Sequence, residues 1–395
     1  MEIRAEKIIS VVSPKLGARI VDFKTKLAAL NSGYSSVAEW QPSAPADYGT
    51  FPQAQFEVSE IYHGDASSFA YNHHQAISKF KDQLVASWSA SPVDEDRPGQ
   101  EVHYATSPDG KKWTKYRVLV ATDPKSSIVR NNAGLCAHDG KLYAYVGVAG
   151  EIKPSTDPNL TSFVPEYIRL DVYVTKDLVT WEEHQGIADN VYIFEGPRSL
   201  KDGSHLCAGC ALIGEQYPLA LRWKPGQDMA SSPQIVHVPW TDRRIRPLQG
   251  TWYQTDDGHV WMYFRDAGMS TRLALSWSDD NGQTWADLVL TDMPNSMARA
   301  NAGRLHDGRY YLIGNNYDRL LDRSHFQIAL SDDGLTFDRM YTLVEGKTHR
   351  RVDGLHKEDG WHYPNSIVDG NKLCVIFSVN KEDICCGVTD VTLMA

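Results

Sequence analysis

The sequence predicts an all-β fold: a seven-bladed β-propeller with four antiparallel strands in each blade, closed by strands from both chain termini. Three observations predict it. Six hairpin segments resemble one another, a second turn signature follows four of them, and 395 residues divided among seven blades give about 56 residues a blade. A six-bladed propeller with an N-terminal extension is the alternative. In either case we expect residues 1–395 to form a single propeller domain, because closing the ring leaves only short, protected sheet edges.

Each hairpin segment has an apolar approach, a tight turn at Asp-Gly or a variant of it, and then an alternating apolar strand. Asp-Gly between two alternating runs is a hairpin signal, because glycine accepts the positive φ angle that the turn requires. The turn aspartates are Asp82, Asp139, Asp202, Asp256 or Asp257, Asp307 and Asp369. Their spacing of about 50 to 63 residues is close to the period of propeller blades.

The second signature is fullest at residues 276–288, where Ser278-x-Asp280-x-Gly282-x-Thr284-Trp285 occurs. Shorter relatives lie at 107–113, 175–181 and 331–337. These segments resemble the Asp-box of sialidase-type propellers. The resemblance implies that the aspartate caps backbone N–H groups in a turn between the two outer strands of a blade, opposite the active-site face. We therefore expect these residues to be structural.

The composition limits the partners of the chain. The formal net charge of −10 argues against nucleic acid as a partner. No apolar run approaches the roughly 18 residues of a membrane-spanning helix, so we expect no membrane partner. We expect a monomer. We also expect an extracellular, secreted protein, although the first residues, MEIRAEKI, show no signal peptide and the expectation assumes that one was removed.

Polar residues recur at one phase of the repeat. In a propeller the innermost strand of each blade leads from one mouth of the channel to the hairpin turn, so residues about six to nine positions before the turn surround that mouth. The inner strands supply Asn72, His73, His74, Arg130, Asn131, Gln249, Trp252, Arg299, Asn301, Tyr363 and Asn365. The end of the second strand adds Arg265. The sequence thus predicts one convergent polar site, the usual form of a ligand site.

The residue types in this ring predict an acidic saccharide as the ligand. Guanidinium groups such as those of Arg130 and Arg265 bind carboxylates through paired hydrogen bonds, and Trp252 suits stacking on a sugar ring. β-Elimination from a uronic acid needs a group that neutralises the carboxylate, a base and an acid. We predict His73, His74, Tyr363 and Arg299 as the catalytic residues, since histidine can serve as base or acid near neutral pH. The other eight residues of the ring are predicted to bind the substrate.

Several of these segments also point to a family. The runs YNHHQAISKF (71–80), RNNAGLCAHDG (130–140), ARANAGRLHDG (298–308) and YPNSIVDG (363–370) resemble the L-rhamnose-α-1,4-D-glucuronate lyase family, with similarity over roughly residues 56–390. They are also similar to bacterial seven-bladed rhamnosidase-type enzymes that cleave the same linkage.

The resemblance implies a seven-bladed fold and an exo-acting lyase on side chains of gum arabic, an arabinogalactan-type polysaccharide. Such an enzyme releases rhamnose, leaves an unsaturated uronate and uses a histidine near the channel mouth. Some members hold Ca²⁺ in the channel, so calcium is expected here, and no organic cofactor is.

Two questions stay open at this stage. Hydrolysis of the same linkage, a sialidase-like activity and a non-catalytic sugar-binding propeller are the alternatives to the lyase. Side chains alternate along a strand, so His73 and His74 are expected to face opposite ways, with His73 slightly favoured as the catalytic residue.

Overall fold

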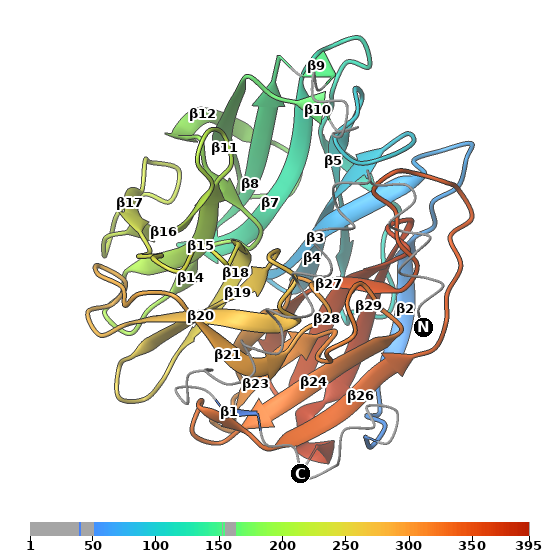
Figure 1. Ribbon diagram of the computed structural model, residues 1–395. Coiled ribbons are helices and arrows are strands. Elements are labelled where there is room, and N and C mark those ends of the chain that lie inside the picture. The colour runs from blue at the N-terminus through green and yellow to red at the C-terminus, as the bar shows by residue number, and fades with distance from the viewer. Residues whose placement is uncertain (1–38, 41–50, 152, 155–162, 395) are drawn as a thin grey trace, which may run out of the picture.

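Six sheets stand around a common axis in the computed structural model, which describes residues 39–40, 51–151, 153–154 and 163–394 (Figure 1). Each sheet is antiparallel, and its innermost strand leads through a tight turn into the second strand. The prediction of four-stranded antiparallel propeller blades is confirmed. Within the part of the chain that the structure describes, there is no helix long and apolar enough to cross a membrane.

The blades follow chain order. Blade 1 contains β3 (Tyr71–Phe80), β4 (Gln83–Ser91), β5 (Glu101–Ser107) and β6 (Arg117–Val120). Blade 2 contains β7 (Val129–His138), β8 (Lys141–Gly150), β11 (Tyr167–Thr175) and β12 (Glu182–Asp189). Blade 3 contains β15 (His205–Ala211), β16 (Tyr217–Trp223) and β17 (Gln234–His237), with an inner strand divided into β13 (Tyr192–Ile193) and β14 (Arg198–Ser199).

The remaining blades have the same plan. Blade 4 contains β18 (Pro247–Gln254), β19 (Val260–Asp266), β20 (Arg272–Ser278) and β21 (Val289–Pro294). Blade 5 contains β22 (Asn301–Arg304), β23 (Tyr310–Gly314), β24 (His325–Ser331) and β26 (Arg339–Glu345). Blade 6 contains β27 (Trp361–Asp369), β28 (Lys372–Val379), β29 (Asp383–Asp390) and β2 (Glu57–Tyr62). Smaller elements are β1 (Glu39–Trp40), paired with β25 (Thr336–Phe337), β9 (Lys153–Pro154), paired with β10 (Phe163–Val164), and a 3-10 turn at Val391–Leu393.

The predicted number of seven blades is wrong for the described residues, which form six. Strand β2 was expected to help build a seventh blade, but it pairs antiparallel with β29 and is the outermost strand of blade 6. A blade shared by both ends of the chain was predicted, and this part of the prediction is confirmed. The error arose from dividing the whole length by seven, since residues 51–70 contribute only one strand to the ring. Residues 1–38 and 41–50, also assigned to that blade, lie outside the described residues.

Both predicted turn signatures occupy their expected places. All six hairpin aspartates lie in or beside the turn between the innermost and the second strand of a blade. In the Asp-box of blade 4, Asp280 Oδ1 accepts hydrogen bonds from the backbone N–H groups of Gln283 (2.9 Å) and Thr284 (2.8 Å). The Trp285 ring that follows is buried in the cluster between blades 3 and 4, with Leu206. The apolar core thus lies between neighbouring blades, and these turns help to join them.

Candidate functional site

Three inner strands carry the same irregularity. In β3, β18 and β27, two consecutive residues lie opposite a single residue of the neighbouring strand, which is a β-bulge. The first residue of each pair has a positive φ angle: 52° at His74, 54° at Gln249 and 52° at Tyr363. Large side chains rarely adopt this conformation, and each such residue costs about 1–3 kcal/mol. Strain of this kind is characteristic of functional sites.

The three bulge residues, His74, Gln249 and Tyr363, come together although they belong to blades 1, 4 and 6. Arg265 Nη1, from the end of β19, donates hydrogen bonds to Gln249 Oε1 (2.9 Å) and to the Tyr363 hydroxyl (2.6 Å). The rings of His74 and Tyr363 are nearly parallel, at 17°, with centroids 6.3 Å apart. Gln75, the second residue of the β3 bulge, donates to the backbone carbonyl of Tyr363 and so ties two of the bulges together. The bulges therefore build one site at the channel mouth.

Tyr363 lies among cations. The Arg323 guanidinium carbon is 5.5 Å and Lys381 Nζ is 6.0 Å from the centre of its ring. Burial by itself raises the pKa of a phenol, but the positive charges of Arg265, Lys381 and Arg323 outweigh it and hold the Tyr363 pKa below its ordinary value of 10.0. This hydroxyl is a stronger acid than an ordinary tyrosine.

His74 forms a chain of contacts with two charged residues. Its Nε2 lies 3.1 Å from Glu95 Oε1, and Glu95 Oε2 lies 3.3 Å from Lys381 Nζ. Burial would raise the pKa of Glu95, but Lys381 and the hydrogen bond from His74 hold it well below its usual range. An ionised Glu95 accepts a hydrogen bond from the Nε2–H group of His74. When the ring is neutral and Nε2 carries the proton, Nδ1 is the nitrogen with the free lone pair. Nδ1 is buried and has no hydrogen-bond partner among the described residues.

His73 lies deeper than His74. It is fully buried, its Nδ1 is 2.7 Å from Ser378 Oγ, and its ring centre is 4.3 Å from that of Tyr363. Burial, helped by the charge of Lys381, keeps the pKa of His73 well below 6.5, so the ring is neutral. The two histidine rings are 4.9 Å apart rather than on opposite faces, because the bulge interrupts the alternation of side chains on which that prediction rested.

A cavity of about 370 Å³ opens beside His74. Its polar lining consists of His74, Glu95, Asp96 and Gln249. Its apolar lining includes Ile168, Tyr192, Phe194, Leu212, Ile213 and Leu248. Such a cavity can hold one small ligand group beside the bulge residues.

Other predicted residues serve the framework between blades. Asn72 is fully buried, donates to the carbonyls of Phe69 and Glu382, and accepts from the Trp88 indole. Asn365 Oδ1 accepts from the backbone N–H of Ile77, which joins blade 6 to blade 1.

Trp252 is buried between blades 3 and 4, with its indole N–H bonded to the Leu206 carbonyl. It does not line the cavity, because the bulge before it changes the face on which it lies.

The remaining predicted residues surround the mouth and the channel axis. Arg130 is half-buried and donates to Thr122 Oγ1 (3.1 Å), and Asn131 donates to Asp96 Oδ1 (3.1 Å) at the edge of the cavity. Arg299 is fully buried, and none of its three guanidinium nitrogens has a hydrogen-bond partner among the described residues.

A family model described as a BNR repeat-like domain matches residues 82–375. The chain belongs to this family. The match spans all six hairpin turns and the four Asp-boxes of the BNR propeller. A search of curated proteins found no match in sequence.

Solved structures share the fold at low identity. A sialidase superposes with a TM-score of 0.63 at 18% identity, covering 89% of this chain and 35% of that chain. A protein of unknown function from Dyadobacter fermentans DSM 18053 gives 0.63 at 16%, with 85% and 98% covered. The intramolecular trans-sialidase of Ruminococcus gnavus gives 0.63 at 11%, with 89% and 99% covered. The BNR propeller thus spans about a third of the first of these chains, and at such identities the likeness shows the fold alone.

The channel axis of the BNR propeller does not suit the calcium ion that the resemblance implies. Its carboxylate is Glu195, which reaches from blade 3 to the Asn301 amide of blade 5 (3.1 Å). Arg198 lies 3.2 Å and Arg299 3.8 Å from the same carboxylate. Two guanidinium groups around one carboxylate repel a divalent cation, whose protein ligands are oxygen atoms free of competing charge. The residues of the axis therefore do not fit Ca²⁺.

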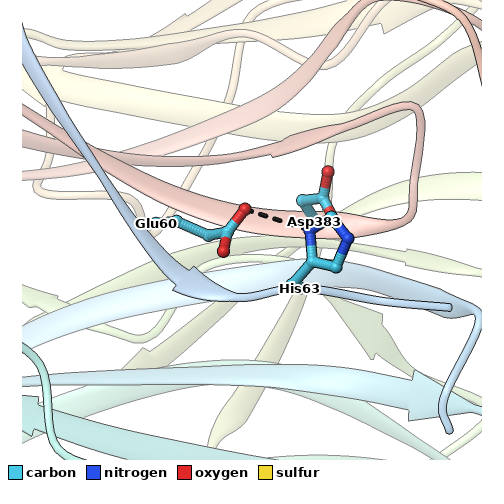
Figure 2. A group of neighbouring side chains, drawn as sticks. All are labelled: Glu60, His63 and Asp383. Carbon is cyan, nitrogen blue, oxygen red and sulfur yellow. Dashed lines mark hydrogen bonds and ion pairs between the residues drawn. The ribbon is translucent and has the colours of Figure 1, made fainter.

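One group among the described residues does have metal-ligand geometry, but an arginine already binds one of its carboxylates. Figure 2 shows Glu60 of β2 and His63 just beyond it facing Asp383 at the start of β29. His63 Nδ1 lies 3.1 Å from Glu60 Oε2 and 3.2 Å from Asp383 Oδ1. Arg351 Nη1 donates to Asp383 Oδ2 (2.9 Å). This group is an ion-pair network that links β2 to β29 within blade 6 and includes Arg351 from the loop before β27.

Sequence reasoning missed four charged residues of the site: Glu95, Asp96, Arg323 and Glu358. All four lie in loops rather than at the start of an inner strand. Arg323 Nη2 pairs with Glu358 Oε2 (3.1 Å) beside Tyr363. The acidic run Asp94-Glu95-Asp96 in the loop after β4 was an available signal.

Proposed function

We propose that this BNR propeller is a polysaccharide lyase that removes a terminal rhamnose from glucuronate by β-elimination. The proposed linkage is the L-rhamnose-α-1,4-D-glucuronate bond of gum arabic side chains, the substrate that the sequence resemblance implies. The products are free rhamnose and an unsaturated uronate. The observation that carries the proposal is the convergence of three strained bulge residues on Arg265, which places a histidine, a phenol and a guanidinium in one site.

Arg265 is the proposed partner of the uronate carboxylate. It is half-buried, and only its Nη1 is engaged by described residues, so Nε and Nη2 keep donors for a carboxylate. Around Tyr363, the three cations Arg265, Arg323 and Lys381 face the two carboxylates Glu95 and Glu358. Neutralising the uronate carboxylate makes the hydrogen on the adjacent ring carbon more acidic.

Proton transfer falls to His74 and Tyr363. His74 Nδ1 takes the proton from the carbon next to the carboxylate, and the electron pair forms a carbon–carbon double bond. The bond from the next ring carbon to the glycosidic oxygen breaks, and Tyr363 gives its proton to that oxygen. In glucuronate the departing hydrogen and oxygen lie on the same face of the ring. A base and an acid with parallel rings 6.3 Å apart on one side of the site match this requirement.

His73 and Arg299 have supporting roles in this proposal. The fully buried His73 packs against Tyr363 and holds its ring, and Arg299 balances the charge of Glu195 beneath the site.

Hydrolysis of the same linkage is the second candidate, and one observation favours it. A tyrosine whose pKa is lowered by neighbouring cations is also a potential nucleophile. A hydrolase would make a saturated uronate by adding water, whereas a lyase makes a conjugated double bond.

The test is incubation of a rhamnose-capped glucuronide with the protein while ultraviolet absorbance and free rhamnose are followed together. The proposal expects both to rise in equal molar amounts. Release of rhamnose without absorbance would assign the protein to the hydrolases, and binding without release would leave a sugar-binding module. Gum arabic from which the terminal rhamnose has been removed by mild acid is the matched control, and it should give no signal.

A further inference from the structure

The hairpin that joins β28 to β29 places a lysine at the mouth in a strained conformation. Its turn is closed by a hydrogen bond from the Glu382 N–H to the Val379 carbonyl (2.8 Å), and the two residues between them have positive φ angles, 57° at Asn380 and 56° at Lys381. Such turns favour asparagine followed by glycine, because glycine adopts the conformation without strain. Asn380 fits this preference, whereas Lys381 costs stability that a glycine in its place would not.

Contacts on both sides fix this turn in the ring of blades. Asn380 Oδ1 accepts a hydrogen bond from the Gly360 N–H (3.0 Å), and the Asn380 N–H donates to the Gly360 carbonyl (2.9 Å). The Lys381 carbonyl accepts a hydrogen bond from the Asn72 N–H (2.8 Å), in the inner strand of blade 1 and two residues before His74. The backbone of Lys381 is therefore held at a fixed place relative to the strand that carries the proposed base.

The ammonium group of Lys381 lies between the two proton-transfer groups of the site. Its side chain is only 8% exposed, and Nζ is 3.3 Å from Glu95 Oε2. The other carboxylate oxygen of Glu95 is 3.1 Å from His74 Nε2. Nζ also lies 6.0 Å from the centre of the Tyr363 ring. One positive charge thus reaches the base side and the acid side of the site together.

A second lysine shows that a strained turn by itself does not require this arrangement. Lys81, in the hairpin turn between β3 and β4, also has a positive φ angle (54°), but it is exposed, and its Nζ donates to the Lys176 carbonyl (2.7 Å). Burying an ammonium group is far more costly than exposing one, unless the charge is paired. Strain and a buried charge at one residue are characteristic of a functional position.

We propose that Lys381 is a positioning residue that holds Glu95 against His74 and stabilises the ionised form of Tyr363 with the same charge. The inference rests on the proposed function for the roles of His74 and Tyr363 as base and acid, whereas the contacts of Lys381 do not depend on it. Without the ammonium group, Glu95 loses the cation beside its Oε2 and is held less firmly toward His74 Nε2. Tyr363 becomes a weaker acid at the same time.

The other charges around Tyr363 stay in place when Lys381 is replaced. The cations are Arg265, Arg299 and Arg323, the carboxylates near Tyr363 or Lys381 are Glu95 and Glu358, and the titratable rings are those of Tyr71, His73, His74 and His362. Burial raises the pKa of Tyr363, the cations lower it, and Glu95 raises it. Loss of the Lys381 charge therefore raises this pKa.

The experiment follows the ionisation of Tyr363 through the ultraviolet absorbance of tyrosinate, as the difference between each protein and the same protein with Tyr363→Phe. In Lys381→Gly, which removes the charge and relieves the strained φ angle, Tyr363 should titrate about one pH unit higher than in the wild type. Lys381→Met should give the same shift, which separates the lost charge from the lost side-chain volume. Lys381→Arg should restore most of the wild-type titration.

Lys81→Gly is the matched control. It relieves the same kind of strain at a lysine at the far end of β3 from the mouth, so the titration of Tyr363 should not move.

Turnover of the rhamnose-capped glucuronide is measured on the same proteins. Lys381→Gly and Lys381→Met should lower kcat by about tenfold or more, and KM should change little because Arg265 is unchanged. Lys381→Arg should recover most of the loss, and Lys81→Gly should have the wild-type kcat. Unfolding temperatures of all variants are measured alongside, so that a loss caused by misfolding is recognised.

A Tyr363 titration that does not move in Lys381→Gly and Lys381→Met would overturn the proposal, as would an equal shift in Lys81→Gly. The titration is separable from the proposed reaction because it needs no substrate. If Tyr363 titrates as expected but no uronate is cleaved, Lys381 remains the charge partner of Tyr363 and the lyase assignment fails. Wild-type kcat in Lys381→Met would instead remove the positioning role and leave the lyase assignment intact.

Discussion

Replacing Tyr363 with phenylalanine removes one hydroxyl from the centre of the site and leaves its ring in place. The ring contacts with His73 and His74 do not involve the hydroxyl, and the positive φ angle is equally strained for either side chain. Arg265 Nη1 loses one acceptor but keeps Gln249. Since Arg265 is only half-buried, we expect the free energy of unfolding to fall by about 1 kcal/mol or less.

The effect on turnover should be far larger. Loss of the acid that protonates the leaving oxygen lowers kcat by about 10²–10⁴, which corresponds to roughly 3–5.5 kcal/mol of activation free energy. KM should change little, because the carboxylate still meets Arg265.

The assay follows formation of the unsaturated product at saturating substrate, with denaturant unfolding of the same preparation. Tyr311→Phe is the matched control: Tyr311 is buried, its hydroxyl contacts Ser366 Oγ at 2.8 Å, and kcat should not change. A Tyr363→Phe variant with wild-type kcat would refute the proposed role of the hydroxyl.

Two further predictions follow from contacts of the site, and a third follows from the Asp-box. Glu95→Gln and His74→Asn should each lower kcat by about a hundredfold or more. The double variant should have nearly the same kcat as either single variant, because both changes remove the same oriented base. A double variant whose loss is the product of the two single losses would contradict this. Removing a cation in Arg265→Gln should raise the pKa of Tyr363. Because the neutral phenol is the active form, the fall of kcat at alkaline pH should then occur at higher pH than in the wild type. A pH–kcat profile whose alkaline limb does not move is the opposing result. Asp280→Ala should lower the free energy of unfolding by about 1–2 kcal/mol without changing kcat, because Asp280 caps two backbone N–H groups far from the mouth; denaturant unfolding that shows no loss would count against the structural role of the Asp-box.

Much of the fold could be predicted because each propeller blade contains turn motifs that can be identified from a few neighbouring residues. The Asp-Gly hairpins and the capping aspartates depend on residues within a few positions of one another, so a single sequence contains the signal. The number of blades is not local. Whether an N-terminal strand completes the last blade or starts another depends on its pairing with β29, more than 320 residues away, which no short pattern records.

The site was predicted in part, for a related reason. The position of each residue relative to its hairpin turn correctly predicted that His74, Gln249, Arg265 and Tyr363 lie at one mouth of the channel. The same criterion also selected Asn72 and Trp252, which bond to the framework, because the bulges that decide which side chain faces the mouth were not visible in the sequence.

Glu95 and Glu358 were missed since loops bring them in from outside the repeat. The single domain, the secreted location and the monomeric state remain predictions.

Mass spectrometry of the uronate product formed in heavy-oxygen water tests the central claim most directly. If His74 and Tyr363 carry out an elimination, the product lacks one water relative to the hydrolysis product and contains no heavy oxygen. A saturated uronate would show that water attacks the linkage, and the assignment of these two residues as base and acid of an elimination would be wrong.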